Sequence, residues 1–291
     1  MFILVLLFVI ATVVLSNNTV NATDSMVINT YEELTTKQNF LHSQYLLTKS
    51  KDVSKELQEV QDEIIDFKNH IYELKELSIE ELKRYNYNDT QIEAIKSYDG
   101  SENKSLRAAA TMTFSVKKNT LSYNSSTGIS TMKATVNFTW GGGAEEYGRD
   151  SFAMAYEADN NHNFKQISIA SSSLQYKEYK STTDIKTWTK SATKKGDQGV
   201  TGSYGWDFPF KVMGDKYYAF LSSGSFSITG EVSGKVKYFN VRYLYSHKIR
   251  ALSTTVGITI STTGVTAGIS LTTNSSYRGY PSDHGGLVTC S

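Results

Sequence analysis

A two-residue alternation of apolar and polar side chains recurs along the chain from Arg107 to the C-terminus. It is clearest where Met132, Ala134, Val136, Phe138 and Trp140 alternate with Lys133, Thr135, Asn137 and Thr139. Successive side chains of a β-strand point to opposite faces, so this rhythm predicts strands with one buried and one solvated face. Most of the chain is therefore constrained to form sheets.

Further strands are predicted at residues 112–116, 152–158, 166–180, 204–212, 217–221, 225–231, 235–245, 256–262 and 265–272. Residues 124–128 have the composition of a turn, which predicts a hairpin between the first two strands. Roughly nine to eleven strands without intervening helices favour an antiparallel sandwich or barrel over a parallel sheet. Cys290 is the only cysteine, so no disulfide can form within the chain, and we expect it to lie in a frayed tail.

Residues 30–98 have a different period. Their apolar positions are spaced by four and three, which predicts one stripe on a helix: Val53, Leu57, Val60, Ile64, Phe67, Ile71 and Leu74. A helix of this length is marginal alone, so the stripe needs a partner. We favour a helical hairpin that turns near residues 48–52, or docking onto the β domain, while a coiled-coil dimer would give self-association.

Two short helices are predicted to follow. Ser78 with Glu81 forms a capping box for a helix that ends at Asn86, and Asn88 with Gln91 caps the next. Lys96 is the only basic residue on the second of these helices, which argues against DNA reading. We expect an α+β fold by segments: N-terminal helices, then a large all-β antiparallel sandwich or barrel-like domain.

The N-terminus has the pattern of an export signal. Residues 2–15 are apolar, and Val20 and Ala22 occupy the −3 and −1 positions of a cleavage site before Thr23. We therefore expect a secreted or extracellular protein, or one anchored to the membrane by this apolar segment. The segments are 1–22 (signal peptide or anchor), 23–106 (acidic, helical) and 107–291 (antiparallel β domain).

Charge is divided between these segments. Residues 24–106 contain 17 acidic and 10 basic side chains, whereas residues 107–291 contain 12 acidic and 20 basic ones. This asymmetry predicts that the two segments dock on each other or that the basic segment meets an anionic partner; two separately solvated surfaces would give the same counts.

The stretch EELKRYNYNDTQIEAIKSYDGSE, followed by LRAAATMTFSV, resembles a loose group of uncharacterised secreted proteins of Gram-positive bacteria. The resemblance covers about 35 residues. It implies export and a layout of helices followed by strands. It brings no activity and no site residue.

The search for chemistry favours a non-enzymatic protein without cofactor or metal. The sequence contains no nucleophile elbow, phosphate loop, zinc-protease motif or dinucleotide fingerprint. The five histidines lack ligand spacing. Asp159, Asn161 and Asn163 mimic the start of a calcium loop, but Phe164 stands where that loop needs glycine. Glu145 and Glu146 point to opposite faces if they lie on a strand, which makes them poor partners for glycoside hydrolysis.

A basic stretch with aromatic residues supplies the candidate surface. It comprises Tyr176, Lys177, Tyr179, Lys180, Lys186, Trp188, Lys190, Lys194 and Lys195. Lysines pair with phosphate or carboxylate groups, and aromatic rings stack on sugars or bases. We favour a cell-envelope-associated binding module whose partner is an anionic envelope polymer or a membrane surface; export disfavours nucleic acid. A soluble hairpin would give the same pattern.

Residues 251–276 support the alternative function. This stretch is uncharged, and its apolar residues alternate with Gly, Ser and Thr on either side of Gly264. A β-pore-forming or membrane-active protein needs such a hairpin, with the acidic helical segment as a pro-region. The strands are about seven residues long, shorter than the ten or so of a membrane strand, and a hairpin inside a soluble sandwich shows the same alternation.

Overall fold

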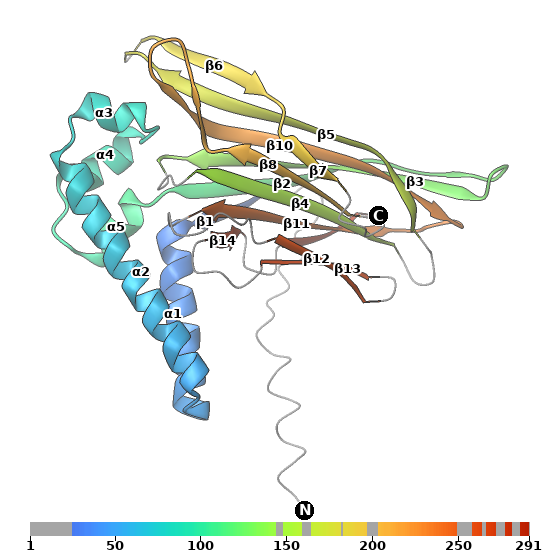
Figure 1. Cartoon of the computed structure of the whole chain (residues 1–291), viewed down its shortest axis with the longest axis horizontal. Helices are drawn as coiled ribbons and strands as arrows, with labels where there is room; N and C mark the ends of the chain where they lie inside the picture. Colours follow the sequence, from blue (N-terminus) through green and yellow to red (C-terminus); the bar gives the residue numbers. More distant parts are fainter. Residues whose placement is uncertain are drawn as a thin grey trace, which may run out of the picture.

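The computed structural model describes residues 25–143, 148–158, 164–181, 183–196, 203–248, 258–263, 266–271, 277–280 and 286–290. It shows two antiparallel sheets packed as a sandwich, with the helices gathered at one end (Figure 1). This confirms the predicted α+β class. The export signal, Glu145, Glu146 and the calcium-like Asp159, Asn161 and Asn163 lie outside the described residues.

In the described part of the chain, five helices precede most of the strands: α1 Thr30–Thr48, α2 Lys51–Glu76, α3 Ile79–Arg84, α4 Asp89–Lys96 and α5 Glu102–Ala108. The predicted hairpin turn is confirmed between α1 and α2. The α2 stripe packs on α1, where Leu57, Val60 and Ile64 contact a cluster with Tyr31 and Leu34. Within one chain, α1 therefore covers the first half of the stripe, whereas Ile71 and Leu74 pack against α3, α4 and α5.

The predicted caps are also present. Ser78 and Asn88 each accept a hydrogen bond from the third residue of the helix that follows, and both capping boxes are complete. Asn86 adopts φ of 65°, as expected of the residue that ends a helix. Helix α5 was not predicted, because its seven residues show no apolar period. It extends across the expected segment boundary at Arg107.

The first sheet has the order β1-β2-β3-β10-β5-β6, and β9 also pairs with β10. Its strands are β1 Ser25–Asn29, β2 Thr111–Asn124, β3 Ile129–Gly141, β5 Phe164–Tyr179, β6 Ile185–Lys190, β9 Lys211–Met213 and β10 Tyr218–Ser233. The hairpin predicted between β2 and β3 is confirmed. Two predicted strands are in fact the single strand β10, and β1 comes from the segment predicted as helical.

The second sheet has the order β14-β11-β4-β8-β7, and β15 also pairs with β11. Its strands are β4 Arg149–Ala158, β7 Thr193–Gly196, β8 Ser203–Pro209, β11 Phe239–Lys248, β14 Tyr277–Tyr280 and β15 Gly286–Cys290. Cys290 is buried in β15, so the expectation of a frayed tail is wrong. Burial raises the pKa of this thiol to about 11.

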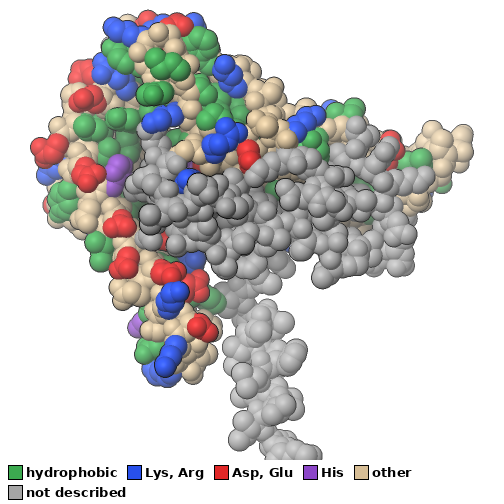
Figure 2. All heavy atoms as spheres, in the orientation of Figure 1, with side chains coloured by type: hydrophobic (Ala, Val, Ile, Leu, Met, Phe, Trp, Pro, Cys, Tyr) green, Lys and Arg blue, Asp and Glu red, His purple; other side chains and the backbone are tan. Residues whose placement is uncertain are grey.

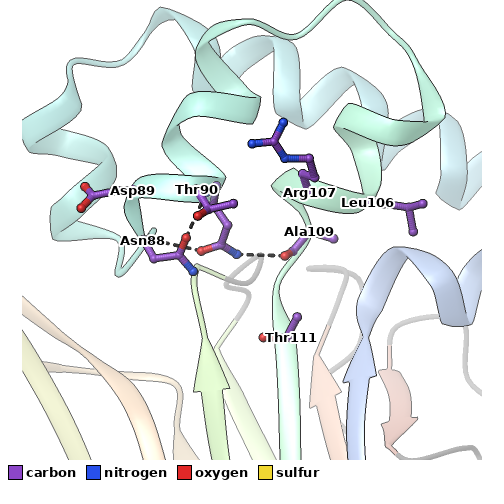
Figure 3. Close-up of a pocket in the computed structure, with 8 residues that line it drawn as sticks. Asn88, Asp89, Thr90, Leu106, Arg107, Ala109 and Thr111 are labelled. Carbon is purple, nitrogen blue, oxygen red and sulfur yellow. Dashed lines mark hydrogen bonds between the residues drawn. The ribbon is translucent and has the colours of Figure 1, made fainter.

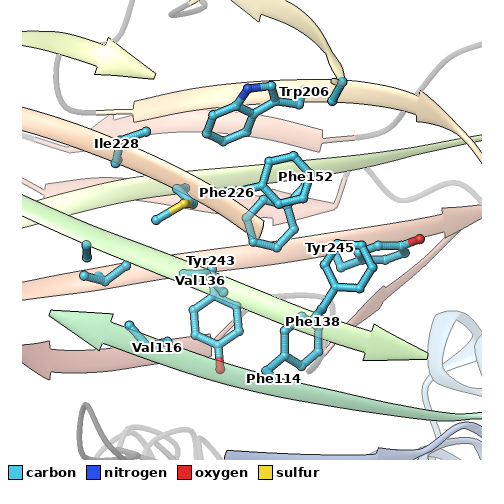
Figure 4. Close-up of a cluster of buried hydrophobic side chains, with 14 of the residues drawn as sticks. Phe114, Val116, Val136, Phe138, Phe152, Trp206, Phe226, Ile228, Tyr243 and Tyr245 are labelled. Carbon is cyan, nitrogen blue, oxygen red and sulfur yellow. The ribbon is translucent and has the colours of Figure 1, made fainter. Parts of the chain in front are cut away.

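Aromatic rings fill the space between the two sheets (Figure 4). Phe152 of β4 stacks on Phe226 of β10 with ring centroids 4.2 Å apart. Phe138 of β3 contacts Phe208 and Tyr245 of the opposite sheet. Because such rings bury large apolar areas, this layer is the main source of stability.

The helices dock on the sandwich at its glycine turn. Gln91 of α4 donates its side-chain amide to the carbonyl oxygens of Ala109 (2.9 Å) and Gly141 (3.2 Å). Gly142 has φ of +93° and lies against the Gln91 carboxamide, and Gly143 lies against Tyr87. The helices therefore dock on this glycine run.

Among the described residues, no helix is both long and apolar enough to span a membrane.

Candidate functional site

The predicted basic and aromatic residues lie on β5, β6 and β7, except Lys180, which lies in the turn between β5 and β6. The register pairs Tyr176 with Trp188 and Glu178 with Lys186. Pleating therefore places Glu178, Lys186 and Trp188 on the Tyr176 face, and Lys177 with Tyr179 on the other. Tyr176 is buried and donates its hydroxyl to the carbonyl oxygen of Pro209 (2.8 Å). The nine residues are thus divided between both faces of the hairpin and β7, where Lys194 and Lys195 lie.

Glu178 is the buried centre of this end of the molecule. Its carboxylate accepts backbone N–H bonds from Asp215 (2.9 Å), Lys216 (2.7 Å) and Tyr217 (2.9 Å), and one from Trp188 Nε1 (3.2 Å). Burial raises the pKa of Glu178, but these four bonds outweigh it and hold the pKa at about 2. The carboxylate therefore fixes the turn between β9 and β10 against β5.

Two of the predicted lysines are committed to the same turn. Asp215 Oδ2 lies 2.8 Å from Nζ of Lys180 and 2.9 Å from Nζ of Lys186, which also lies over the Trp188 ring at 4.1 Å. The hydrogen bond from Lys180 and then that from Lys186 lower the pKa of Asp215. Lys177, Lys190 and Lys194 remain exposed. Much of the basic stretch therefore stabilises the fold.

The second candidate is the hairpin of β12 Ile258–Thr263 and β13 Thr266–Leu271. Its register pairs Ile258 with Leu271 and Ile260 with Ile269, while Thr259 pairs with Ser270. The hairpin is thus built of one row of mainly apolar residues and one row of Ser, Thr and Gly. Among the described residues it forms a two-stranded sheet of its own.

The hairpin rests on the second sheet, where β13 lies against β4 and β11 (Figure 1). The face of that sheet turned away from the aromatic core combines small residues with Leu244, Arg242 and Asp207. Ala153 pairs with Leu244 on one side and Gly205 on the other, and all three are buried. The neighbouring rows contain Ser151, Ala155, Ser203, Ser246 and Asp207, also buried, and the half-buried Arg242. We call this set the seat.

A buried polar cluster lies on the core face at the end of β4 and β11. Asp150 accepts a hydrogen bond from the Tyr245 hydroxyl and lies 3.0 Å from Nδ1 of His247. The Lys248 backbone N–H donates to the same carboxylate (3.1 Å). Burial and then the Asp150 charge raise the pKa of Tyr245 well above its ordinary value. Sequence reasoning missed this cluster because its members come from strands far apart in the chain.

An open pocket of about 600 Å³ lies between α4, α5 and β2 (Figure 3). Its walls include the Asn88–Gln91 capping box. Arg107 lies 3.1 Å from Glu93, and Asp89 lies 2.8 Å from Lys83. These charged groups are therefore paired within the protein, and the pocket is the crevice left where the helices meet the sheet. Within the described part of the chain, no cluster of side chains has the composition of a metal site.

Comparison with known proteins gives little. No family model matches the sequence, and no curated protein does. Among solved structures, Clostridium perfringens delta-toxin aligns at 6% identity over 48% of this chain and 74% of its own, with a TM-score of 0.24. A structure titled "Pore forming protein" aligns at 8% identity over 62% of this chain and 84% of its own, with a TM-score of 0.21. Such low TM-scores do not establish a common fold.

Proposed function

We propose that this chain is a non-enzymatic, exported membrane-active protein that inserts its β12–β13 hairpin into a lipid bilayer. The observation that carries the proposal is the hairpin itself: it is uncharged, has one apolar row and, among the described residues, forms a sheet of its own that lies against β4 and β11. A hairpin that only completed a soluble sandwich would normally be hydrogen-bonded to a neighbouring strand.

The sequence around the hairpin is long enough to span a bilayer. No charged residue lies between Arg250 and Arg278, and Gly264 stands midway between them. Each arm therefore offers at least 12 uncharged residues, whereas a membrane strand needs about 9–11. The short described strands would lengthen into these uncharged flanks.

The seat allows the hairpin to leave without disrupting the sandwich. Both strands of the hairpin bond to each other, so the main-chain ladder moves with it. What release removes is the packing of β13 on β4 and β11, whose outer face carries small side chains such as Ala153 and Ala155. Small side chains bury little apolar area each, so this contact is weaker than that of the aromatic core.

A single hairpin cannot remain alone in a bilayer. Its two outer edges would expose unpaired N–H and C=O groups to hydrocarbon, where each costs several kcal/mol. Closure into a barrel removes both edges. The proposal therefore requires several copies, each contributing one hairpin, with the apolar row toward lipid and the Ser, Thr and Gly row toward water.

Dye release from phosphatidylglycerol-containing vesicles tests this proposal with the full chain. Ile260→Lys places a charge in the apolar row, which costs about 2–4 kcal/mol near the bilayer midplane. Ser261→Lys, on the neighbouring residue, places the same charge in the other row and serves as the matched control. We expect the wild type and Ser261→Lys to release dye and Ile260→Lys to release none, with equal thermal melting. Intact vesicles with wild-type protein, or equal release by both variants, would contradict insertion.

Envelope binding is the second proposal, and the exposed Lys177, Lys190 and Lys194 support it. It predicts retention on anionic envelope material that falls at high salt, because exposed charges are screened. Retention that is unchanged by salt would count against it.

A further inference from the structure

Four strands bring a row of exposed apolar and aromatic residues to one end of the sandwich. At this end β6, β5, β10 and β9 lie side by side. Ile185 pairs with Tyr179, and Tyr218 pairs with Met213. Glu178 pairs with Ala219 across β5 and β10. The next residue outward on each strand, Tyr179 and Tyr218, therefore points to the face of the sheet opposite to that of Glu178. Ile185, Tyr179, Tyr218 and Met213 form what we call the end row.

The end row faces away from the aromatic core. Ile185 is 52% exposed, Tyr218 is 52% exposed and Met213 is 65% exposed. Tyr179 is half-buried. Isolated exposed apolar residues are ordinary, but a contiguous row across four strands indicates a surface that meets an apolar partner.

Cations surround the end row. Lys177 precedes Tyr179 on the same face, and Lys211 lies over the Tyr218 ring at 4.8 Å. Arg84 and Lys216 lie over the nearby Tyr217 ring at 4.3 and 5.2 Å. In Figure 2, hydrophobic side chains are interspersed with Lys and Arg over the end where α3 and β6 lie, whereas acidic side chains gather along α1 and α2.

The carboxylates at this end are largely neutralised by the protein. Glu178 is buried under three backbone N–H groups, and Asp215 is paired with Lys180 and Lys186. Asp184, in the β5–β6 turn, and Glu80, on α3, add exposed carboxylates. The charge that the end row presents outward is therefore mainly positive.

The hairpin is attached at the same end. Lys248 ends β11 and pairs with Tyr277 at the start of β14, so these two residues bracket the hairpin segment. The neighbouring His247 ring contacts Phe210, with centroids 5.1 Å apart, and Phe210 directly precedes β9. A hairpin released from the seat would thus pivot beside the strand that carries Met213.

We infer that the end row is the surface by which the protein first contacts an anionic phospholipid bilayer. Aliphatic and aromatic side chains enter the headgroup boundary, and the surrounding Lys and Arg pair with lipid phosphates. A polar envelope polymer would satisfy the cations but would offer no hydrocarbon for Ile185 and Met213. This inference rests on the proposed function and assigns it a binding surface distinct from the inserting hairpin.

Co-sedimentation with phosphatidylglycerol-containing vesicles tests the inference separately from dye release. Ile185→Ser combined with Met213→Ser should weaken binding at least tenfold, because each side chain loses most of its burial in the bilayer. Ile169→Ser is the matched control, since Ile169 is a β5 residue that is 63% exposed and lies outside the end row. Lys177→Gln should weaken binding severalfold and reduce its salt dependence, whereas Lys55→Gln on α2 should change neither.

The outcomes separate the two proposals. Wild-type binding by the Ile185→Ser and Met213→Ser double variant would overturn the end row as the contact surface, whatever the hairpin does. Loss of binding in the double variant, with Ile260→Lys bound but unable to release dye, supports both proposals. Binding through the end row without dye release by the wild type would support the end row and contradict insertion.

Discussion

The Gln91 side chain lies directly over Gly142, and a Cβ atom added to this glycine would clash with Gln91 Nε2. Gln91 also completes the cap of α4 and bonds to the carbonyl oxygens of Ala109 and Gly141. One side chain therefore joins the start of a helix to the ends of β2 and β3.

We predict that Gly142→Ala lowers the free energy of unfolding by about 2–4 kcal/mol, since it adds a clash to an unfavourable φ of +93°. Gly128→Ala is the matched control, because Gly128 also has positive φ (+66°) but has no heavy atom within 4 Å of the added Cβ. It should cost about 1 kcal/mol. Denaturant unfolding measures both variants. Equal decreases in the free energy of unfolding would contradict a clash between Gln91 and the Cβ atom added at residue 142.

Stability should fall in acid through Glu178. Its folded pKa of about 2 lies below the ordinary value of 4.5, so its stabilising contribution is present above pH 4.5 and is lost as the pH falls toward 2. Glu178→Gln keeps the shape but removes the charge that four donors share, which should cost roughly 2 kcal/mol at pH 7.

Unfolding curves of wild type and Glu178→Gln, recorded from pH 7 to pH 2, check this prediction. The difference between them should shrink steadily below pH 4.5. Glu157→Gln is the control. Glu157 is half-buried and forms one described ion pair, with Arg242, so this substitution should lower the free energy of unfolding at pH 7 by less than Glu178→Gln does. A difference that stays constant across this range would mean that the Glu178 charge does not fix the turn.

The sequence predicted correctly those helices and strands in which the spacing of apolar residues, or a capping motif, is complete within the element itself. The α2 stripe, the caps at Ser78 and Asn88 and the alternation from Met132 to Trp140 all specify their own local structure. The edge strands β1, β6, β7, β14 and β15 were missed because each is four to six residues long and depends on its neighbour for pairing.

The candidate surface shows the same limit. The sequence showed that Lys180, Lys186 and Trp188 belong to one basic stretch. It could not show that Asp215 pairs with both lysines or that Glu178 accepts a hydrogen bond from Trp188. Asp215 lies in the turn between β9 and β10, far along the chain, and only the register of β5 and β6 shows that Glu178 lies beside Trp188. The end row was missed for the same reason, because Ile185 and Met213 become neighbours only through β5 and β10.

Overpacking the seat should loosen the hairpin selectively. Ala153→Leu inserts a larger side chain beneath β13, and overpacking of this kind costs about 1–3 kcal/mol. We expect faster proteolysis within residues 251–277 and faster dye release, with little change in the melting of the sandwich. Ala134→Leu, buried in the core of β3, should lower the melting temperature and leave the hairpin protected until the whole fold opens. The reverse pattern would contradict the seat.

Depth measurement along the hairpin tests insertion most directly. Single cysteines with an environment-sensitive fluorophore replace Ile258, Ile260, Ile269 and Leu271 in one row, and Thr259, Ser261 and Ser270 in the other, in a Cys290→Ala background. On addition of phosphatidylglycerol-containing vesicles, we predict a blue shift and quenching by lipid-borne quenchers for the first row only. Spectra unchanged by vesicles in both rows would contradict the claim that this hairpin enters the bilayer.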